Sequence, residues 1–262
     1  MPLTVTMNRP PVLIPHAPGT NRDAEAALAV AAAGGDPRIV AVNELRKRPA
    51  ALSDYGAVLL PGGFSYGDAL GAGGRLALEL RAWFGAELRQ AARSGKPILG
   101  ICNGFQTLVK SGLLGSRTFT LAANAGGRFE CRWVTVRIEP GCSSSWLAPL
   151  GGSRIRCPVA HGEGRFAVAG ARAVTELTEA GCVAFRYLAS GTEGGAAANA
   201  AGAYPANPNG SVDDIAGMCD PTGAIVGLMP HPEDHIADWQ RPSGPPGERG
   251  SALFEAFVDA AR

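Results

Sequence analysis

The chain has 262 residues, of which 24 are basic and 23 acidic, so its formal net charge of +1 provides no global basic field for binding nucleic acid. It contains no apolar stretch of about 18 residues, so no membrane-spanning helix is predicted. Its six cysteines lie far apart with no Cys-x-x-Cys pair, so we expect no metal site, no disulfide framework and a reducing, cytoplasmic location. Because no linker divides the chain, we expect one domain over residues 1–262.

Short apolar runs alternate with helical patterns through the first half of the chain. Strands are predicted at residues 12–14, 39–42, 57–60 and 97–101, and helices at 21–34, 74–94 and 103–113. This alternation predicts an α/β fold with an open, mostly parallel sheet that carries helices on both faces.

The second half has a different pattern. Alternating apolar and polar residues predict antiparallel edge strands at 128–139, 154–160, 182–188 and 213–219, followed by a strand at 224–229 and a helix at 251–262. Residues 189–211 are rich in small and turn-forming residues, and we expect a mobile surface loop there.

A cysteine stands between two glycines directly after the strand predicted at 97–101, in the stretch GICNG at residues 100–104. Gly-x-Cys-x-Gly between a strand and a helix is the cysteine form of the nucleophile elbow, a tight turn that aims the side chain outward. The positive end of the helix favours a Cys102 thiolate, and the Asn103 amide is free to face an oxyanion. By itself the pattern is equally compatible with a small core cysteine.

A Gly-Gly pair follows the strand predicted at 57–60, in the stretch Pro61-Gly62-Gly63-Phe64. Glycines there allow backbone amides to face a neighbouring site, and the amide of Gly63 is a candidate second oxyanion donor. Two alternatives are a plain strand–helix turn and a phosphate-binding loop, although the Walker lysine pattern is missing.

A histidine and a carboxylate follow the strand predicted at 224–229, in the stretch Pro230-His231-Pro232-Glu233. The prolines favour extended backbone, in which residues two apart point the same way. Glu233 can therefore accept a hydrogen bond from one ring nitrogen of His231 and leave the other nitrogen to face a thiol. This is the arrangement of nucleophile, base and orienting carboxylate.

The three motifs, each at a strand end and in this order, resemble those of the class I (triad-type) glutamine amidotransferases. More narrowly, six stretches resemble the glutaminase subunits of phosphoribosylformylglycinamidine synthase, an enzyme of purine biosynthesis. They are LLPGGFSYGDALGAG, GICNGFQTL, RFECRWV, PVAHGEGRF, YPANPNGS…IAGMCD and GLMPHPE. The resemblance extends from about Val12 to Ile236 and implies a flavodoxin-like fold.

The resemblance implies hydrolysis of L-glutamine to glutamate and ammonia. Cys102 would attack the side-chain amide carbon, His231 would transfer the proton to the leaving ammonia, and Glu233 would orient His231. Backbone amides at Gly63 and Asn103 would hold the oxyanion.

Four further residues are predicted to contact glutamine, namely Gly62, Phe64, Gln106 and His161. Gln106 lies one helical turn past Cys102 on the same predicted helix face. His161 belongs to the HGEG stretch that matches the family loop beside the glutamine pocket.

The resemblance also implies partners. A synthetase subunit would bind ATP and Mg²⁺ and use the ammonia to convert formylglycinamide ribonucleotide to formylglycinamidine ribonucleotide, and a small accessory subunit would join the complex. No cofactor is expected in this chain, which has no ATP-binding signature.

One residue departs from the subfamily pattern, which usually has arginine after the catalytic glutamate where this chain has Asp234. An added carboxylate there would raise the His231 pKa or weaken docking to a partner. Two rival functions are a stand-alone cysteine hydrolase of the DJ-1/PfpI kind, which shares the sheet and elbow, and a non-catalytic docking module.

Overall fold

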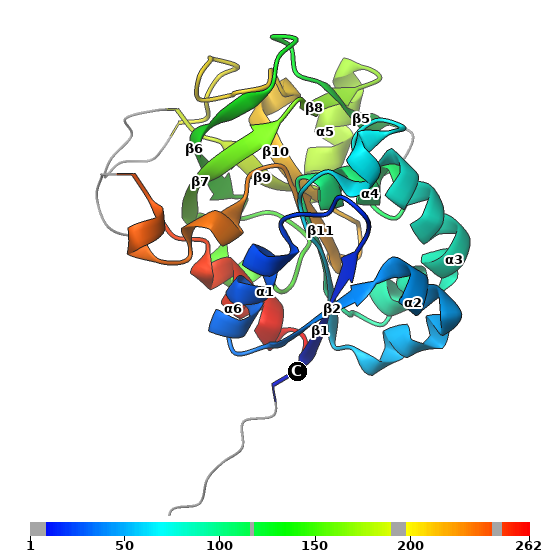
Figure 1. Ribbon diagram of the computed structural model, residues 1–262. Coiled ribbons are helices and arrows are strands. Elements are labelled where there is room, and N and C mark those ends of the chain that lie inside the picture. The colour runs from blue at the N-terminus through cyan, green and yellow to red at the C-terminus, as the bar shows by residue number, and fades with distance from the viewer. Residues whose placement is uncertain (1–8, 116–117, 190–197, 243–247) are drawn as a thin grey trace, which may run out of the picture.

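The computed structural model describes residues 9–115, 118–189, 198–242 and 248–262. A nine-stranded sheet with helices on both faces forms its centre (Figure 1). In sheet order, the strands are β2 (Asp36–Ala41), β1 (Pro11–His16), β3 (Ala57–Leu60), β4 (Ile98–Ile101), β11 (Ile225–Leu228), β10 (Ile215–Cys219), β9 (Val183–Tyr187), β6 (Glu130–Ile138) and β7 (Arg154–His161).

The sheet changes direction at one strand pair. The strands from β2 to β11 are parallel, whereas β10, β9, β6 and β7 add to them as antiparallel strands. Every residue of β3, β4 and β11 is buried, and strands covered on both faces are expected to be continuously apolar. The α/β fold with antiparallel strands in the second half is therefore confirmed.

Helices cover both faces of this sheet. α1 (Asp23–Ala32) and α6 (Ser251–Asp259) lie together on one side, and α3 (Gly74–Arg93) and α4 (Asn103–Ser111) lie on the other (Figure 1). The two remaining helices are α2 (Val42–Lys47) and α5 (Ala171–Glu179). No helix within the described ranges is both long enough and apolar enough to cross a membrane.

The helix α3 shows why the sequence pattern predicts these elements well. Leu76, Leu80, Phe84 and Leu88 recur every fourth residue and are all buried. Because residues four apart share one helix face, they form a single apolar stripe against the sheet.

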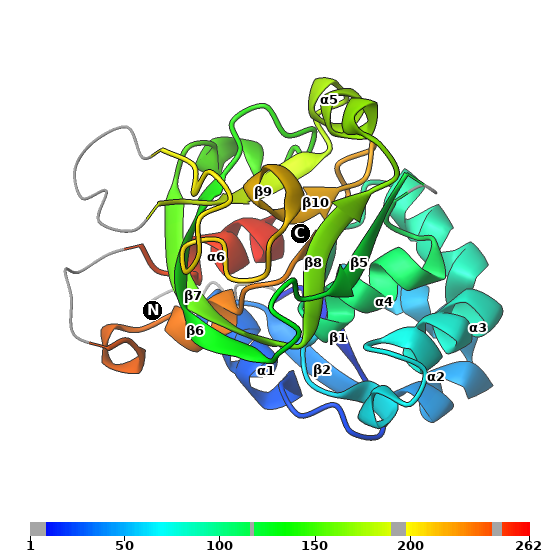
Figure 2. The same cartoon turned by 90° about the horizontal axis from the view of Figure 1, so that it is seen from above.

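A second, two-stranded antiparallel sheet was not predicted. It consists of β5 (Phe119–Ala123) and β8 (Glu163–Val168) and lies beside α4 (Figure 2). Only Gly162 separates β8 from β7, so the HGEG stretch at residues 161–164 is the junction of the two sheets. Helix α5 and the short α2 were also missed by the sequence pattern.

The predicted surface loop at 189–211 holds for residues 201–205, which are exposed, but is wrong for residues 207–211, most of which are buried. Residues 190–197 lie outside the described residues. Asn207 and Asn209 are both only 1% exposed. The Asn207 side chain donates to the Ser211 carbonyl and to Asp214, and Asn209 donates to the Gly164 carbonyl. These side-chain amides satisfy buried polar groups, so the segment packs without regular secondary structure.

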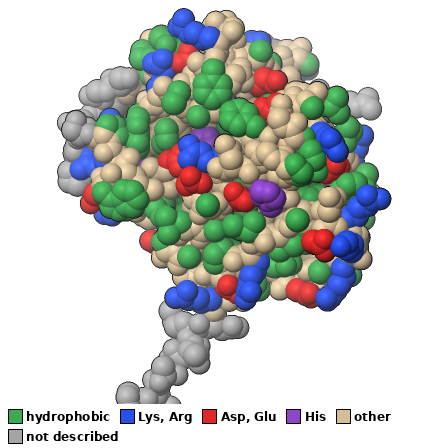
Figure 3. All heavy atoms as spheres, in the orientation of Figure 1, with side chains coloured by type: hydrophobic (Ala, Val, Ile, Leu, Met, Phe, Trp, Pro, Cys, Tyr) green, Lys and Arg blue, Asp and Glu red, His purple; other side chains and the backbone are tan. Residues whose placement is uncertain are grey.

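The face of the molecule seen in Figure 3 carries a mixture of charges. Lys and Arg side chains are interspersed with Asp and Glu, and apolar side chains lie between them. This distribution agrees with the balanced composition of the whole chain.

Candidate active site

Cys102 occupies a strained turn between β4 and α4. Its φ of 49° and ψ of −105° are unusual for a residue with a side chain. The Cys102 backbone amide donates to Leu228 of the neighbouring strand β11 at 2.8 Å. The turn is therefore fixed by the sheet, and the thiol points toward the Ala160 carbonyl oxygen, 3.7 Å from Sγ.

The glycines on each side of this turn are required by close packing. A Cβ atom at Gly104 would lie 2.0 Å from the Leu60 carbonyl oxygen, and one at Gly100 would lie 2.8 Å from the Gly104 carbonyl carbon. Any larger residue would push α4 away from β3 and β4. The GICNG pattern is thus explained by the approach of helix to sheet.

His231 and Glu233 form a buried pair after β11. The His231 Nδ1 and Glu233 Oε1 atoms are 2.7 Å apart, and the two residues are 2% and 1% exposed. Burial by itself lowers the pKa of His231, but the negative charges of Glu233 and of a Cys102 thiolate raise it well above its ordinary value. The contact between His231 Nε2 and Cys102 lacks the geometry of a full hydrogen bond, as is common before a substrate binds.

Gly62 lies between these two groups. A Cβ atom there would lie 2.6 Å from Cε1 of His231 and 3.5 Å from Cβ of Cys102. The absence of a side chain at Gly62 is what allows the imidazole to lie beside the thiol.

We therefore expect Gly62→Ala to lower kcat/KM for glutamine hydrolysis about 10- to 100-fold, because a displacement of about 1 Å in an active site costs on the order of 100-fold. Steady-state kinetics of the purified variant measures this effect. Gly141→Ala is the matched control, since a Cβ atom at Gly141 meets no atom within 4 Å. Wild-type kinetics for Gly62→Ala would show that the imidazole does not need this space.

The loop that follows β3 is held by the loop that follows β1. Gly63 has a φ of 114°, and a Cβ atom there would lie 2.5 Å from Oδ1 of Asn21. The Phe64 amide donates to the Gly19 carbonyl at 3.3 Å. Gly63 is thereby fixed at the edge of the pocket that contains Cys102.

Asn103 contributes more than a backbone amide. Its own amide is the first of α4 and so has no partner within the helix. Its buried side chain accepts a hydrogen bond from the Ser65 hydroxyl at 2.6 Å and donates to Asp68 at 2.9 Å and Gln106 at 3.3 Å. No sequence motif indicates this second role, in which the side chain connects the turn at Cys102 to the loop after β3.

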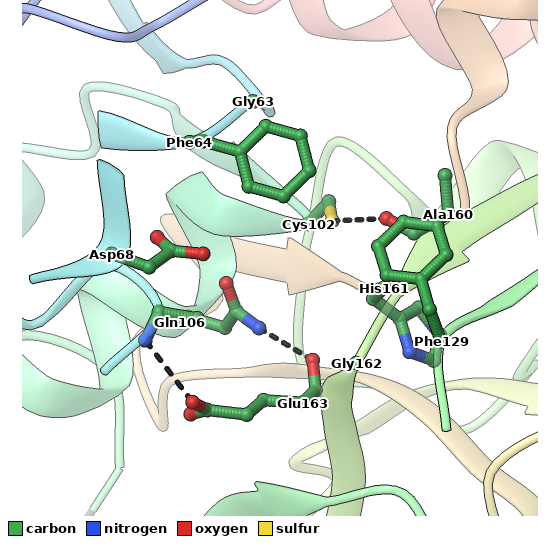
Figure 4. A pocket seen from close by; sticks show the side chains of 11 residues that line it. Gly63, Phe64, Asp68, Cys102, Gln106, Phe129, Ala160, His161, Gly162 and Glu163 are labelled. Atoms are coloured by element: carbon green, nitrogen blue, oxygen red, sulfur yellow. Dashed lines mark hydrogen bonds between the residues drawn. The ribbon is translucent and has the colours of Figure 1, made fainter. Parts of the chain in front are cut away.

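A pocket of about 300 Å³ opens at Cys102 (Figure 4). Its volume is at the lower end of those that hold small ligands. The predicted residues Gly63, Phe64, Cys102, Gln106 and His161 line it together with Asp68, Ala72, Phe129, Ala160, Gly162 and Glu163. The structure thus brings five predicted residues into one cavity, with Gly62, His231 and Glu233 behind the thiol.

Gln106 and His161 form opposite parts of the pocket wall. The Gln106 Nε2 atom donates to the Glu163 carbonyl at 2.5 Å and so connects α4 to the start of β8. The His161 Nδ1 atom lies 3.1 Å from Oδ1 of Asn124. Burial and the neighbouring His231 lower the pKa of His161 to about 4, so its ring is neutral at pH 7.

Two exposed aromatic rings flank the pocket. Phe64 and Phe129 are 45% and 50% exposed, and their ring centroids are 6.4 Å apart in a stacked arrangement. Phe129, Asp68 and Glu163 were missed as site residues. All three lie inside the stretches RFECRWV, PGGFSYGD and HGEGRF, so these family-specific motifs are the sequence signal that could have identified them.

The unusual Asp234 is turned toward helix α1. Its Oδ1 atom lies 3.2 Å from Nη1 of Arg22, and its side chain is 16% exposed. Burial raises the pKa of Asp234, and the adjacent Glu233 raises it further. Asp234 therefore forms an ion pair with Arg22, while the positive charges of His231 and Arg22 both act to lower its pKa.

The fold and the arrangement of Cys102, His231 and Glu233 are those expected of a glutamine amidotransferase, and sequence comparison gives the same class of protein. Residues 9–262 match the family model of the CobB/CobQ-like glutamine amidotransferase domain.

Two curated relatives and one solved structure identify a smaller group within this class. The chain is 44% identical to phosphoribosylformylglycinamidine synthase subunit PurQ of Treponema denticola, over 95% of this chain and 97% of the relative. It is also 44% identical to the PurQ subunit of Frankia casuarinae, over 92% and 90% of the two chains. A chain in the structure of PurLQS from Thermotoga maritima superposes with a TM-score of 0.71 at 30% identity, over 96% of this chain and 98% of that chain. The chain therefore belongs to the CobB/CobQ-like glutamine amidotransferases and, among them, to the PurQ subunits of phosphoribosylformylglycinamidine synthase.

Proposed function

We propose that this chain is a single glutaminase domain that hydrolyses L-glutamine and passes the ammonia to a synthetase subunit of phosphoribosylformylglycinamidine synthase. The observation that carries the proposal is the His231–Glu233 pair next to Cys102, which lines the pocket. Family membership favours this function over a stand-alone cysteine hydrolase or a docking module.

The chemistry follows the positions of the three groups. The Cys102 sulfur attacks the amide carbon of the glutamine side chain, and a thioester bond forms. His231 takes the proton of the Cys102 thiol and gives it to the nitrogen, which leaves as ammonia. Water then attacks the thioester carbon and loses a proton to His231, which releases glutamate and restores the thiol. Glu233 holds the ring through Nδ1 and stabilises its protonated form.

Backbone amide groups stabilise the oxyanion in this proposal. The amides of Gly63 and Asn103 lie on loops that meet beside Cys102, and Asn103 connects those loops through Ser65 and Asp68. Donors fixed before the reaction stabilise the developing charge without reorganising. Gln106, Phe64 and His161 form the walls that hold the substrate.

The proposed partners are a synthetase subunit, which binds ATP and Mg²⁺, and a small accessory subunit. The relatives' designation as subunits of a synthase supports a multi-subunit enzyme. Formylglycinamide ribonucleotide is the proposed acceptor of the ammonia. All six cysteines are free, which fits a reducing compartment such as the cytoplasm.

The test is a steady-state glutaminase assay of the chain alone and then with the synthetase and accessory subunits, the acceptor and ATP. We expect stimulation of about 10²- to 10³-fold, the value of one oxyanion donor brought into place. The reason is that the isolated chain holds the Gly63 amide at the pocket edge, and a partner at the pocket mouth would align this amide and the wall at His161 with the bound substrate. Full activity of the isolated chain, unchanged by partners, would contradict the proposal and favour a stand-alone hydrolase.

A further inference from the structure

Asp68 lies on the pocket wall in a turn that fixes its direction. Tyr66, Gly67 and Asp68 have successive φ values of 55°, 61° and 54°. The Tyr66 hydroxyl donates to Glu79 at 2.5 Å, and the Arg75 guanidinium lies 4.1 Å from the centre of the Tyr66 ring. These contacts anchor the turn on α3 and direct the Asp68 carboxylate into the pocket (Figure 4).

One oxygen of the Asp68 carboxylate already accepts hydrogen bonds within the chain. Oδ1 of Asp68 accepts from Nδ2 of Asn103 at 2.9 Å and, at 3.4 Å, from the Gly73 amide. Both donors are neutral, so they position Asp68 without neutralising it. Within the described part of the chain, Asp68 has no ion-pair partner.

A second carboxylate on the same wall is neutralised. Glu163 Oε2 lies 3.2 Å from Nζ of Lys110, and Lys110 also donates to the Ala72 carbonyl at 2.7 Å. Burial raises the pKa of Asp68, and the negative charge of Glu163 raises it further. Two carboxylates therefore line the pocket, and the Lys110 ammonium group pairs with only one of them, which leaves an excess of one negative charge beside the nucleophile.

We infer that Asp68 binds the α-ammonium group of glutamine and selects a free amino acid over amides that lack this charge. The ammonium group lies at the opposite end of glutamine from the carbon that Cys102 attacks, and a cation at Asp68 would neutralise the excess charge. A charged hydrogen bond of this kind is stronger than a neutral one. The inference rests on the proposed glutaminase function and adds a specificity determinant to it.

The test compares Asp68→Asn with the wild type on two substrates. L-Glutamine carries the α-ammonium group, whereas glutaramate is the same molecule without it. Asparagine keeps the oxygen that faces Asn103 and is well tolerated at positive φ, so the variant should fold. We expect kcat/KM for glutamine to fall about 10- to 100-fold, the range for a hydrogen bond to a charged group, and kcat/KM for glutaramate to stay within about 2-fold.

Covalent labelling gives a second readout that does not need turnover. Alkylation of Cys102 by 6-diazo-5-oxo-L-norleucine, which carries the α-ammonium group, should slow by the same factor in Asp68→Asn. Alkylation by iodoacetamide, which has no such group, should not change. Asp54→Asn, on the exposed surface and paired with Arg48, is the matched control and should behave as the wild type in both assays.

The outcomes separate the two proposals. If the wild-type complex hydrolyses glutamine but Asp68→Asn slows glutamine and glutaramate equally, the role of Asp68 is overturned and the glutaminase function stands. If the wild-type complex releases no ammonia from glutamine and Cys102 does not react preferentially with the diazo-ketone, the proposed function itself fails.

Discussion

Replacing Cys102 by alanine should abolish ammonia release from glutamine and leave synthesis from added ammonium salt intact. The variant loses the only thiol among the described residues that lines the pocket and lies beside His231. In the proposed function the synthetase subunit consumes free ammonia, so we expect the assembled complex with Cys102→Ala still to form product when ammonium salt replaces glutamine. The measurement is product formation by the complex under each nitrogen donor.

Peptide mapping after treatment with the diazo-ketone provides the control. We expect one labelled peptide, which contains Cys102. Cys131, the exposed thiol on β6, should react with a general alkylating reagent but not with the glutamine analogue. Diazo-ketone label on Cys131, or glutamine-dependent activity in Cys102→Ala, would exclude Cys102 as the nucleophile.

Replacing Glu233 by glutamine should lower turnover by at least about 10-fold, because general acid–base catalysis contributes on the order of 10²- to 10⁴-fold. The substitution keeps the shape of the side chain but removes the charge that helps to hold the pKa of His231 well above its ordinary value. The group that protonates ammonia must itself be protonated, and its protonated form is lost as the pH rises through its pKa. A lower His231 pKa therefore moves the alkaline limb of the kcat profile to lower pH.

Asp234→Asn is the matched control for this experiment. It removes the neighbouring carboxylate, which pairs with Arg22 rather than with the imidazole. We expect its turnover to stay within about 3-fold of the wild type, in the range of a partly exposed ion pair. Equal pH profiles for wild type and Glu233→Gln would show that Glu233 does not orient His231.

The inner strands of the parallel half are predictable because each is a short apolar run, whereas the edge strand β2 (Asp36–Ala41) is only partly apolar. β3 and β4 are buried throughout, and a run such as Ala57–Leu60 allows few other interpretations. β5 and β8 could not be predicted in the same way. The β8 stretch EGRFAV is short and begins in a glycine motif, and its partner lies more than forty residues earlier. Long-range pairing of this kind leaves no local signal.

The candidate site shows the same division. Cys102, His231 and Glu233 were identified from short local motifs at strand ends, where topology brings side chains to one edge of the sheet. Asp68 could not be assigned from its motif alone, because its direction depends on a turn with three positive φ values and on a contact with Asn103. The packed segment around Asn207 was misread because its composition matches that of loops, while its order comes from side-chain hydrogen bonds.

The side chain of Asn103 sets a limit on how this enzyme can be redesigned. It is only 2% exposed and contacts Ser65 and Asp68, which follow β3, and Gln106 on α4. A substitution at Asp68 that admits a different amide donor also removes a hydrogen-bond partner of Asn103, the residue that follows the nucleophile. Substrate range and rate are therefore not independent design variables here, and a library that varies residues 65–68 should vary residue 103 with them.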